Sequence, residues 1–262
     1  MRKIRFIFAL IIGLALVAGC SNGAKQQDEP KIELTISAAA SLTDSLNEIQ
    51  KLYEVEHPNV KLTFNFGASG SLQQQIEQGA PVDVFFSAGK KQVDALVGKN
   101  LMNRQYVANV VNNELVAVIP SESSLQLQSA KDLSKANIQK LALGEPEAVP
   151  AGSYSKEMLV HNGLWESLNA KMVFAKDVRQ VLTYVESGNV DIGFVYKTDA
   201  RISNKVKVAF TAEAGSHKPI EYPIGIVEGS KHVKESQAWI QFLQSKPAQQ
   251  VFEKYGFVIP GK

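Results

Sequence analysis

Residues 32–56 have the sequence IELTISAAASLTDSLNEIQKLYEVE. Apolar and polar residues alternate over 32–36, which predicts a strand. Apolar residues recur at helical spacing over 42–56, which predicts a helix. We expect Ser41 to be the N-cap of this helix, with Asp44 completing a capping box. Because the loop before the helix contains only alanine and serine, the backbone N–H groups of the helix N-terminus are open to an oxyanion.

Many helices begin with serine and bind nothing, so the prediction of a site depends on further helix starts. A second strand is predicted over 60–66. It leads through a loop of small residues that contains Ser69 into a short helix over 72–78. In the second half of the chain, Ala151 comes just before a helix predicted over 154–161. Ala151 can offer a ligand only its backbone.

A fourth helix start follows at 178–186, where Asp177 is the expected N-cap and Val178 the first helical residue. The buried strand predicted over 190–196 ends on Tyr196. Strands that alternate with helices indicate an α/β protein with mainly parallel sheets, in which ligands gather beyond the carboxyl ends of strands. If the two halves of the chain are lobes that face each other, the four helix starts converge on one cleft. Neutral N–H and O–H donors in such a cleft can hold a dianion without a cation.

The first 19 residues are typical of a secretory signal. Basic residues precede an apolar run over 6–18, which is too short to span a bilayer as a mature helix. The run ends in Val-Ala-Gly-Cys, which resembles a bacterial lipobox in which Cys20 is lipidated and becomes the first mature residue. An ordinary signal that happens to contain a cysteine is the alternative. We therefore predict a signal peptide over 1–19 and a polar, lipid-anchored tether over 20–30.

The charge of the mature chain does not favour a nucleic-acid partner. The whole sequence has a formal net charge of +2, and removal of residues 1–19 takes away three basic residues and no acid, which leaves −1. Cys20 is the only cysteine, so an intrachain disulfide is impossible.

Catalytic and metal-binding alternatives find little support. The four histidines are dispersed, at His57, His161, His217 and His232. None has metal-ligand spacing, and the nucleophile-elbow, Walker and dinucleotide-binding motifs are absent from the sequence. Asp83 is expected to be a structural acid. The basic residues near the proposed site are interpreted as solvated surface that could steer anions; they are Lys156, Lys176, Arg179 and Lys197. We therefore predict neither an enzyme nor a protein with a cofactor.

Five short motifs together carry a resemblance to a known family. They are AAASLT at 38–43, GAPVDVF at 79–85, PEAVPAG at 146–152, EYP at 221–223 and YGF at 255–257. In order and spacing they resemble the molybdate-binding proteins of ABC importers (the ModA family), and the resemblance covers residues 31–260. It implies a two-lobed periplasmic-binding-protein fold of type II, α/β, with mixed, mainly parallel sheets and flanking helices. Lobe I would comprise 31–112 and 224–262, and lobe II would comprise 113–223.

The resemblance also implies the ligand and its contacts. Tetrahedral molybdate would be held by the hydroxyl and backbone groups of Ser41 and Ser69, the N–H groups of Ala151 and Val178, and the hydroxyl of Tyr196. The metal would thus be bound only as its oxyanion, without direct metal ligands. Tungstate, which is nearly the same size, is expected to bind comparably. Phosphate carries a proton near neutral pH and needs an acceptor, whereas the only nearby carboxylate, Asp177, is assigned to capping.

The expected protein is a monomeric receptor, lipid-anchored on the extracytoplasmic face of the cell membrane. It would hand molybdate to an ABC permease and its ATPase. A receptor for another tetrahedral oxyanion, such as sulfate, remains open. So does, with less support, a secreted enzyme on the same scaffold. The effector half of a transcription regulator is disfavoured by the signal peptide and by the lack of a helix-turn-helix segment.

Overall fold

The computed structural model describes residues 31–135 and 137–261. The predicted signal peptide, the tether and Cys20 lie outside these residues. The chain divides into residues 1–31 and 32–262, and the fold described below belongs to the second part. None of the helices in the described ranges combines the length and the apolar character needed to cross a membrane.

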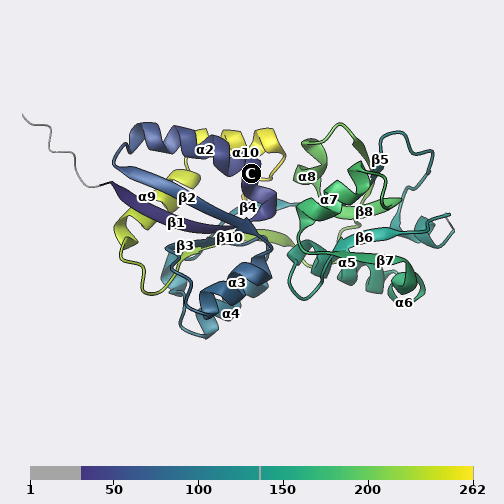
Figure 1. Ribbon diagram of the computed structural model, residues 1–262, viewed down its shortest axis with the longest axis horizontal. Coiled ribbons are helices and arrows are strands. Elements are labelled where there is room, and N and C mark those ends of the chain that lie inside the picture. Colours follow the sequence, from purple (N-terminus) through teal and green to yellow (C-terminus); the bar gives the residue numbers. More distant parts are fainter. Residues whose placement is uncertain (1–30, 136, 262) are drawn as a thin grey trace, which may run out of the picture. The chain divides into compact units, whose positions relative to one another are not determined.

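Within the described residues, ten strands form two five-stranded sheets (Figure 1). The first sheet has the order β2-β1-β3-β10-β4. Its strands are β1 (Ile32–Ala39), β2 (Val60–Gly67), β3 (Val84–Phe86), β4 (Ala108–Asn113) and β10 (Ile220–Ile226). The strand β1 pairs in parallel with β2 and β3, whereas β10 pairs antiparallel with β3 and β4. The sheet is therefore mixed, as predicted.

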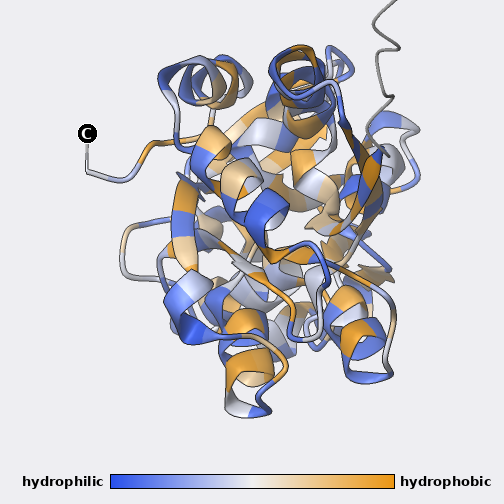
Figure 2. Cartoon of the chain, turned by 90° about the vertical axis from the view of Figure 1, so that its left-hand side faces the viewer, coloured by the Kyte–Doolittle hydropathy of each residue, from blue (hydrophilic) through white to orange (hydrophobic). Residues whose placement is uncertain are grey.

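Helices cover both faces of the first sheet (Figure 1). They are α2 (Thr43–Glu56), α3 (Ser69–Glu77), α4 (Lys90–Gly98), α9 (Val233–Leu243) and α10 (Lys246–Tyr255). Figure 2 shows hydrophobic and hydrophilic residues along the same helices, as expected of amphipathic helices with one face on a sheet. Leu34 and Ile36 of β1 are fully buried beside Tyr53 of α2 and Trp239 of α9. This core fixes the direction in which β1 points toward the site.

The second sheet has the order β7-β6-β8-β5-β9. Its strands are β5 (Leu115–Pro120), β6 (Leu141–Gly144), β7 (Met172–Ala175), β8 (Ile192–Tyr196) and β9 (Val206–Thr211). It has the same pattern of strand pairing as the first sheet: β6 pairs in parallel with β7 and β8, and β5 pairs antiparallel with β8 and β9. Its helices are α5 (Pro150–His161), α6 (Trp165–Leu168), α7 (Val178–Glu186) and α8 (Lys197–Arg201). Short 3₁₀ turns complete the fold: η1 (Ala40–Leu42), η2 (Arg104–Tyr106), η3 (Ala130–Ser134) and η4 (Asn169–Lys171).

The chain crosses between the two sheets twice. The first crossing is Glu114, which separates β4 from β5, and the second is the segment 212–219 between β9 and β10. The strand β10 spans the predicted lobe limit at 223 and pairs with the first sheet from Ile220 onward.

Candidate functional site

One small cavity brings together all five residues predicted to contact a ligand. Ser41, Ser69, Ala151, Val178 and Tyr196 all line it. The rest of its lining consists of Ala39, Ala40, Gly67, Ala68, Ala88, Val149, Pro150 and Asp177. The volume within the cavity that the centre of a water molecule can occupy is about 10 Å³. That is about one water-sized sphere, which excludes a sugar or an amino acid.

Ser41 reaches this cavity in a way that the sequence did not predict. It lies in the middle of the 3₁₀ turn η1, and the following helix α2 has Leu42 as its N-cap, without a side-chain capping bond. The expectation of a Ser41 cap and an Asp44 capping box is therefore wrong. The Ser41 hydroxyl lies 2.9 Å from the hydroxyl of Tyr222, and Ser41 is 3 % exposed. The Ser41 hydroxyl is thus directed at Tyr222 and not at the N–H groups of its own helix.

Ser69 is the first residue of α3, so this helix starts earlier than the predicted position 72. Its Oγ accepts a hydrogen bond from the backbone N–H of Ala88 at 3.0 Å. Since an N–H can only donate, the hydroxyl hydrogen of Ser69 is left to be donated elsewhere. The next residue, Gly70, donates its N–H to the carbonyl of Ala148 at 2.9 Å, which ties α3 to the loop before α5.

Ala151 lies in the first turn of α5, which begins at Pro150 rather than at the predicted position 154. Proline at this position suits a helix start because its missing N–H would have no intrahelical acceptor. The helix packs tightly on the end of β6: a Cβ at Gly152 would lie 1.9 Å from the carbonyl oxygen of Gly144. Only glycine fits at this point, and the close approach holds the Ala151 backbone at the cavity wall.

Val178 is the first residue of α7, and Asp177 is its N-cap, as predicted. The Asp177 carboxylate accepts a hydrogen bond from the backbone N–H of Gln180 at 2.8 Å. The first N–H groups of a helix have no intrahelical acceptor, so α3, α5 and α7 each bring unpaired backbone donors to the neighbourhood of the cavity.

Tyr196 closes the cavity at the end of β8 and is 1 % exposed. Its hydroxyl lies 3.4 Å from the carbonyl oxygen of Ala88, to which it can donate. Burial raises the pKa of Tyr196 well above the ordinary value of 10.0, and neighbouring Tyr222 adds to this rise. Tyr196 is therefore a neutral phenol, and a hydrogen-bond donor, at physiological pH.

Arg179 corrects the prediction that the nearby basic residues are all solvated surface. Its guanidinium lies 2.7 Å from a carboxylate oxygen of Asp44 and 2.7 Å from one of Asp199, and it donates to the carbonyl of Ser41 at 3.3 Å. Asp199 is fully buried, and burial raises its pKa to about 6 although Arg179 opposes the rise. Arg179 thus joins α7 to the 3₁₀ turn that carries Ser41.

Two further basic residues named from the sequence also have partners. Lys197 forms an ion pair with Glu114 at 2.5 Å, and the ammonium of Lys156 lies 5.2 Å from the ring centre of Trp165. No Lys or Arg is among the described residues that line the cavity, so its donors are neutral. Asp83 has the structural role predicted for it, since it accepts from Thr35 N–H at 2.9 Å and from the Ser230 hydroxyl at 2.6 Å.

Sequence reasoning missed Tyr222, which contacts Ser41 from β10. The signal was present in the motif EYP at 221–223, to which no role was given. Among the described residues, His, Cys, Asp and Glu do not gather in groups of three or more that could hold a metal ion.

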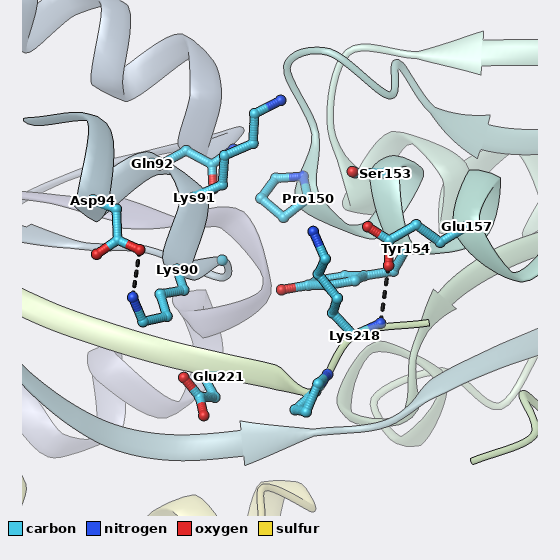
Figure 3. A pocket seen from close by; sticks show the side chains of 12 residues that line it. Lys90, Lys91, Gln92, Asp94, Pro150, Ser153, Tyr154, Glu157, Lys218 and Glu221 are labelled. Atoms are coloured by element: carbon cyan, nitrogen blue, oxygen red, sulfur yellow. Dashed lines mark hydrogen bonds and ion pairs between the residues drawn. The ribbon is translucent and has the colours of Figure 1, made fainter. Parts of the chain in front are cut away.

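A wider groove lies beside the cavity, between α4 and α5 (Figure 3). It offers about 360 Å³ for the centre of a water molecule, and none of the five predicted ligand residues lines it. Its charged side chains have both signs: Lys90, Lys91, Lys218, Asp94, Glu157 and Glu221. Lys90 forms an ion pair with Asp94, and Glu157 accepts from the backbone N–H of Lys218 at 2.9 Å. The groove therefore favours neither anions nor cations.

Comparisons with known proteins agree with this geometry. The family model for bacterial extracellular solute-binding proteins matches residues 34–258. The putative ABC transporter substrate-binding lipoprotein YvgL of Bacillus subtilis is 47 % identical over 257 residues, which cover 98 % of each chain. The molybdate-binding protein ModA of Escherichia coli is 38 % identical over 255 residues, covering 95 % of this chain and 97 % of ModA.

Solved structures extend the comparison to the fold. The substrate-binding domain of a putative molybdenum ABC transporter from Clostridium difficile superposes with a TM-score of 0.69 at 44 % identity, over 87 % of this chain and 99 % of that domain. The periplasmic molybdate-binding protein of Azotobacter vinelandii has a TM-score of 0.79 at 22 % identity, over 87 % and 99 % of the two chains. The predicted two-lobed α/β fold of periplasmic binding proteins is thus confirmed. By sequence and by fold, the chain belongs to the family of bacterial extracellular solute-binding proteins and is related to ModA.

Proposed function

We propose that this protein captures molybdate outside the cytoplasm and delivers it to the permease and ATPase of an ABC importer. The observation that carries the proposal is the meeting of Ser41, Ser69, Ala151, Val178 and Tyr196 around one small cavity. The names of two relatives point the same way, since ModA is a molybdate-binding protein and the Clostridium difficile domain belongs to a putative molybdenum transporter.

The chemistry of the cavity suits an anion with two negative charges. The donors are two serine hydroxyls, one phenol and the backbone N–H groups of Ala151 and Val178. Together they would replace the water shell of the ion. The helix N-termini add a favourable field, each contributing about 0.3–1 kcal/mol and up to ~2 kcal/mol when partly buried. No cation is needed, because neutral donors carry no desolvation penalty comparable with that of a buried charge.

Selectivity among oxyanions would come from size and from the lack of acceptors. Sulfate has the same charge and shape with shorter bonds, so a cavity sized for molybdate leaves long hydrogen bonds to sulfate. Hydrogen phosphate must donate its proton to an acceptor, and we assign the lining carboxylate of Asp177 to capping α7, where it accepts from Gln180 N–H at 2.8 Å. Tungstate should bind about as well as molybdate.

The site would close by movement of two lobes, one built on the first sheet and the other on the second. A ligand that contacts both lobes favours the closed form over an open one, because only differential contacts can shift such an equilibrium. The hydrogen bond from Gly70 N–H in α3 to the Ala148 carbonyl before α5 joins elements that flank different sheets and supports this mechanism.

The protein would be attached to the membrane through lipid on Cys20, with the polar segment 20–30 as a tether. The name of YvgL, a putative substrate-binding lipoprotein, supports this part of the proposal. A Cys20→Ser variant expressed in its own host should be released from the membrane fraction. Retention of that variant in the membrane would contradict lipidation at Cys20.

Calorimetric titration of the purified protein with molybdate, tungstate, sulfate and phosphate tests the function. We expect tight binding of molybdate and tungstate and much weaker binding of the other two ions. Sulfate binding as tight as molybdate binding would make the protein a sulfate receptor instead. Failure to bind any of the four would overturn the assignment of the cavity to oxyanions.

A further inference from the structure

We propose that Tyr222 is a positioning residue that sets the direction of the Ser41 hydroxyl, so that Ser41 donates its hydrogen into the cavity. The proposal deepens the function proposed above and rests on it. Tyr222 does not line the cavity, and it reaches Ser41 from β10, at a distance of 181 residues along the chain. Its role would be to select oxyanions that only accept hydrogen bonds.

The chain of hydrogen bonds begins at Asn113, the last residue of β4. The backbone N–H of Glu114 donates to Asn113 Oδ1 at 2.9 Å, which identifies Oδ1 as the acceptor and Nδ2 as the donor of this amide. The two hydrogens of Nδ2 then go to the hydroxyl oxygen of Thr198 at 3.0 Å and to the hydroxyl oxygen of Tyr222 at 3.2 Å. Because Asn113 is 9 % exposed, little water competes for these bonds.

The phenol of Tyr222 therefore receives a hydrogen from Asn113 and must place its own hydrogen elsewhere. The hydroxyl has two further partners: Ser41 Oγ at 2.9 Å and the hydroxyl of Tyr196, whose contact is the weaker one. If Ser41 donated instead, the phenol hydrogen of this fully buried side chain would have only the weaker contact with Tyr196. A poorly paired buried donor is costly, so the bond runs from Tyr222 to Ser41.

The direction of this hydrogen bond determines what Ser41 can offer a ligand. With its oxygen occupied by Tyr222, Ser41 turns its own hydrogen toward the cavity that it lines. The direction of the Ser69 hydroxyl is fixed in the same way, because the N–H of Ala88 donates to its Oγ at 3.0 Å. Both serines then act as donors, which suits a fully deprotonated tetrahedral oxyanion and disfavours one that must donate a proton, such as hydrogen phosphate.

A double-mutant cycle tests whether Tyr222 acts through Ser41. Molybdate affinity is measured by calorimetry for the wild type, Ser41→Ala, Tyr222→Phe and the double variant. Tyr222→Phe keeps the ring and should weaken binding about 2- to 12-fold, the value of one hydrogen bond. In the Ser41→Ala background the same change should alter affinity less than about twofold, since nothing is left to orient. Independent, multiplying effects would overturn the proposal.

Tyr53→Phe is the matched control, because Tyr53 is also fully buried and its hydroxyl has no hydrogen-bond partner among the described residues. It should leave affinity unchanged. If Tyr222→Phe does not fold, as judged by thermal unfolding, Asn113→Leu takes its place. It removes the donor that fixes the phenol, and it should weaken binding only when Ser41 is present. An equal loss in the Ser41→Ala background would contradict the relay.

These outcomes separate the relay from the function that it serves. A wild type that binds none of the oxyanions refutes the proposed function and the relay together. A wild type that binds molybdate tightly, combined with an additive cycle, refutes the relay alone. A second readout is selectivity: Tyr222→Phe should reduce the preference for molybdate over phosphate, because the freed Ser41 hydroxyl can then accept. An unchanged preference would also count against the relay.

Discussion

The contribution of neutral hydrogen-bond donors to ligand binding is most easily tested at Ser41. Ser41→Ala removes one hydroxyl donor from the cavity and should weaken molybdate binding by ~1–3 kcal/mol, the range for hydrogen bonds to charged groups. Tyr196→Phe should cost less, because the phenol is one donor among several. Calorimetry measures both effects. Ser187→Ala is a suitable control, since the Ser187 hydroxyl bonds only to carbonyls of its own helix, at 2.7 and 3.3 Å. Equal affinity of Ser41→Ala and wild type would contradict the role of this serine.

The buried tyrosines predict how stability depends on pH. Burial raises the pKa of Tyr53 to about 12 and the pKa values of Tyr196 and Tyr222 well above 10.0. In the unfolded chain these phenols lose their protons near pH 10, while in the folded protein they keep them. The unfolded state then binds fewer protons, so stability is fully present below about pH 10 and falls by about 1.4 kcal/mol per tyrosine for each pH unit above it.

Denaturant unfolding between about pH 8 and pH 11 measures this fall in the free energy of unfolding. Tyr53→Phe should make the fall shallower while leaving molybdate affinity unchanged, because this residue is remote from the cavity. The absorbance of ionised tyrosine in the folded protein provides an independent check. Titration of all the tyrosines near pH 10 without unfolding would contradict the prediction.

At the scale of elements, the meeting of α3 with the loop before α5 depends on Gly70. A Cβ at this position would lie 2.5 Å from the carbonyl oxygen of Ala148, far closer than real Cβ contacts. Gly70→Ala should therefore leave the separate lobes intact and obstruct their approach. We expect molybdate affinity to fall by the ~1–3 kcal/mol typical of overpacking. Stability should be unchanged or slightly higher, since alanine favours helices.

Calorimetry and thermal unfolding of Gly70→Ala test the two halves of this prediction. Gly98→Ala is the matched control: Gly98 is also a helical glycine, and a Cβ there has nothing within 4 Å. A Gly70→Ala variant that binds like the wild type would show that the two elements need not approach so closely.

Sequence patterns predicted strands that correspond to β1, β2 and β8 and the alternation of strands with helices, because residue alternation and helical spacing are local properties. They also predicted Asp177 as the cap of α7, since that cap is formed within four residues. They failed at the start of α2, where Ser41 bonds to Tyr222 instead of to its own helix. The partner lies 181 residues away, so no local pattern contains it.

Distance along the sequence also explains why the ion pairs of Arg179 could not be predicted. Sequence patterns favour a solvated Arg179 because neither Asp44 nor Asp199 is its neighbour in the sequence. Its side chain is 24 % exposed, and the fold supplies both carboxylates. The five cavity residues could be named in advance because helix starts with small residues are recognisable locally and because their motifs resemble a known family. Their convergence became visible only in three dimensions.

At the scale of the whole molecule, the ion pair of Arg179 with Asp44 joins parts of the chain that belong to different sheets. Arg179 keeps Asp199 as a partner on its own side, so loss of Asp44 does not leave the guanidinium without a carboxylate. Asp44→Asn should therefore destabilise the closed form and not the fold. Because the side chain of Asp44 is 40 % exposed, solvent screens the pair, and we expect a loss of about 0.5–1 kcal/mol in molybdate affinity.

Stopped-flow measurement should place this loss mainly in a faster dissociation rate. Small-angle scattering of the ligand-free variant should show a more open average shape than that of the wild type. Glu33→Gln is the control, since Glu33 pairs with Lys61 at 3.1 Å on the first sheet alone. A dissociation rate equal to that of the wild type would indicate that the Arg179–Asp44 pair has no part in closure.

The small volume of the cavity has a kinetic consequence. Its walls come from elements of both sheets, and one ion-sized space is all that they leave. We expect an ion held there to leave mainly when these walls separate. Residence time is therefore governed by how often the molecule opens, and two ions of quite different affinity could escape at similar rates if both wait for the same motion. A transporter would then obtain the ion by opening the two lobes. A competing binding site on the transporter would not be enough to remove it.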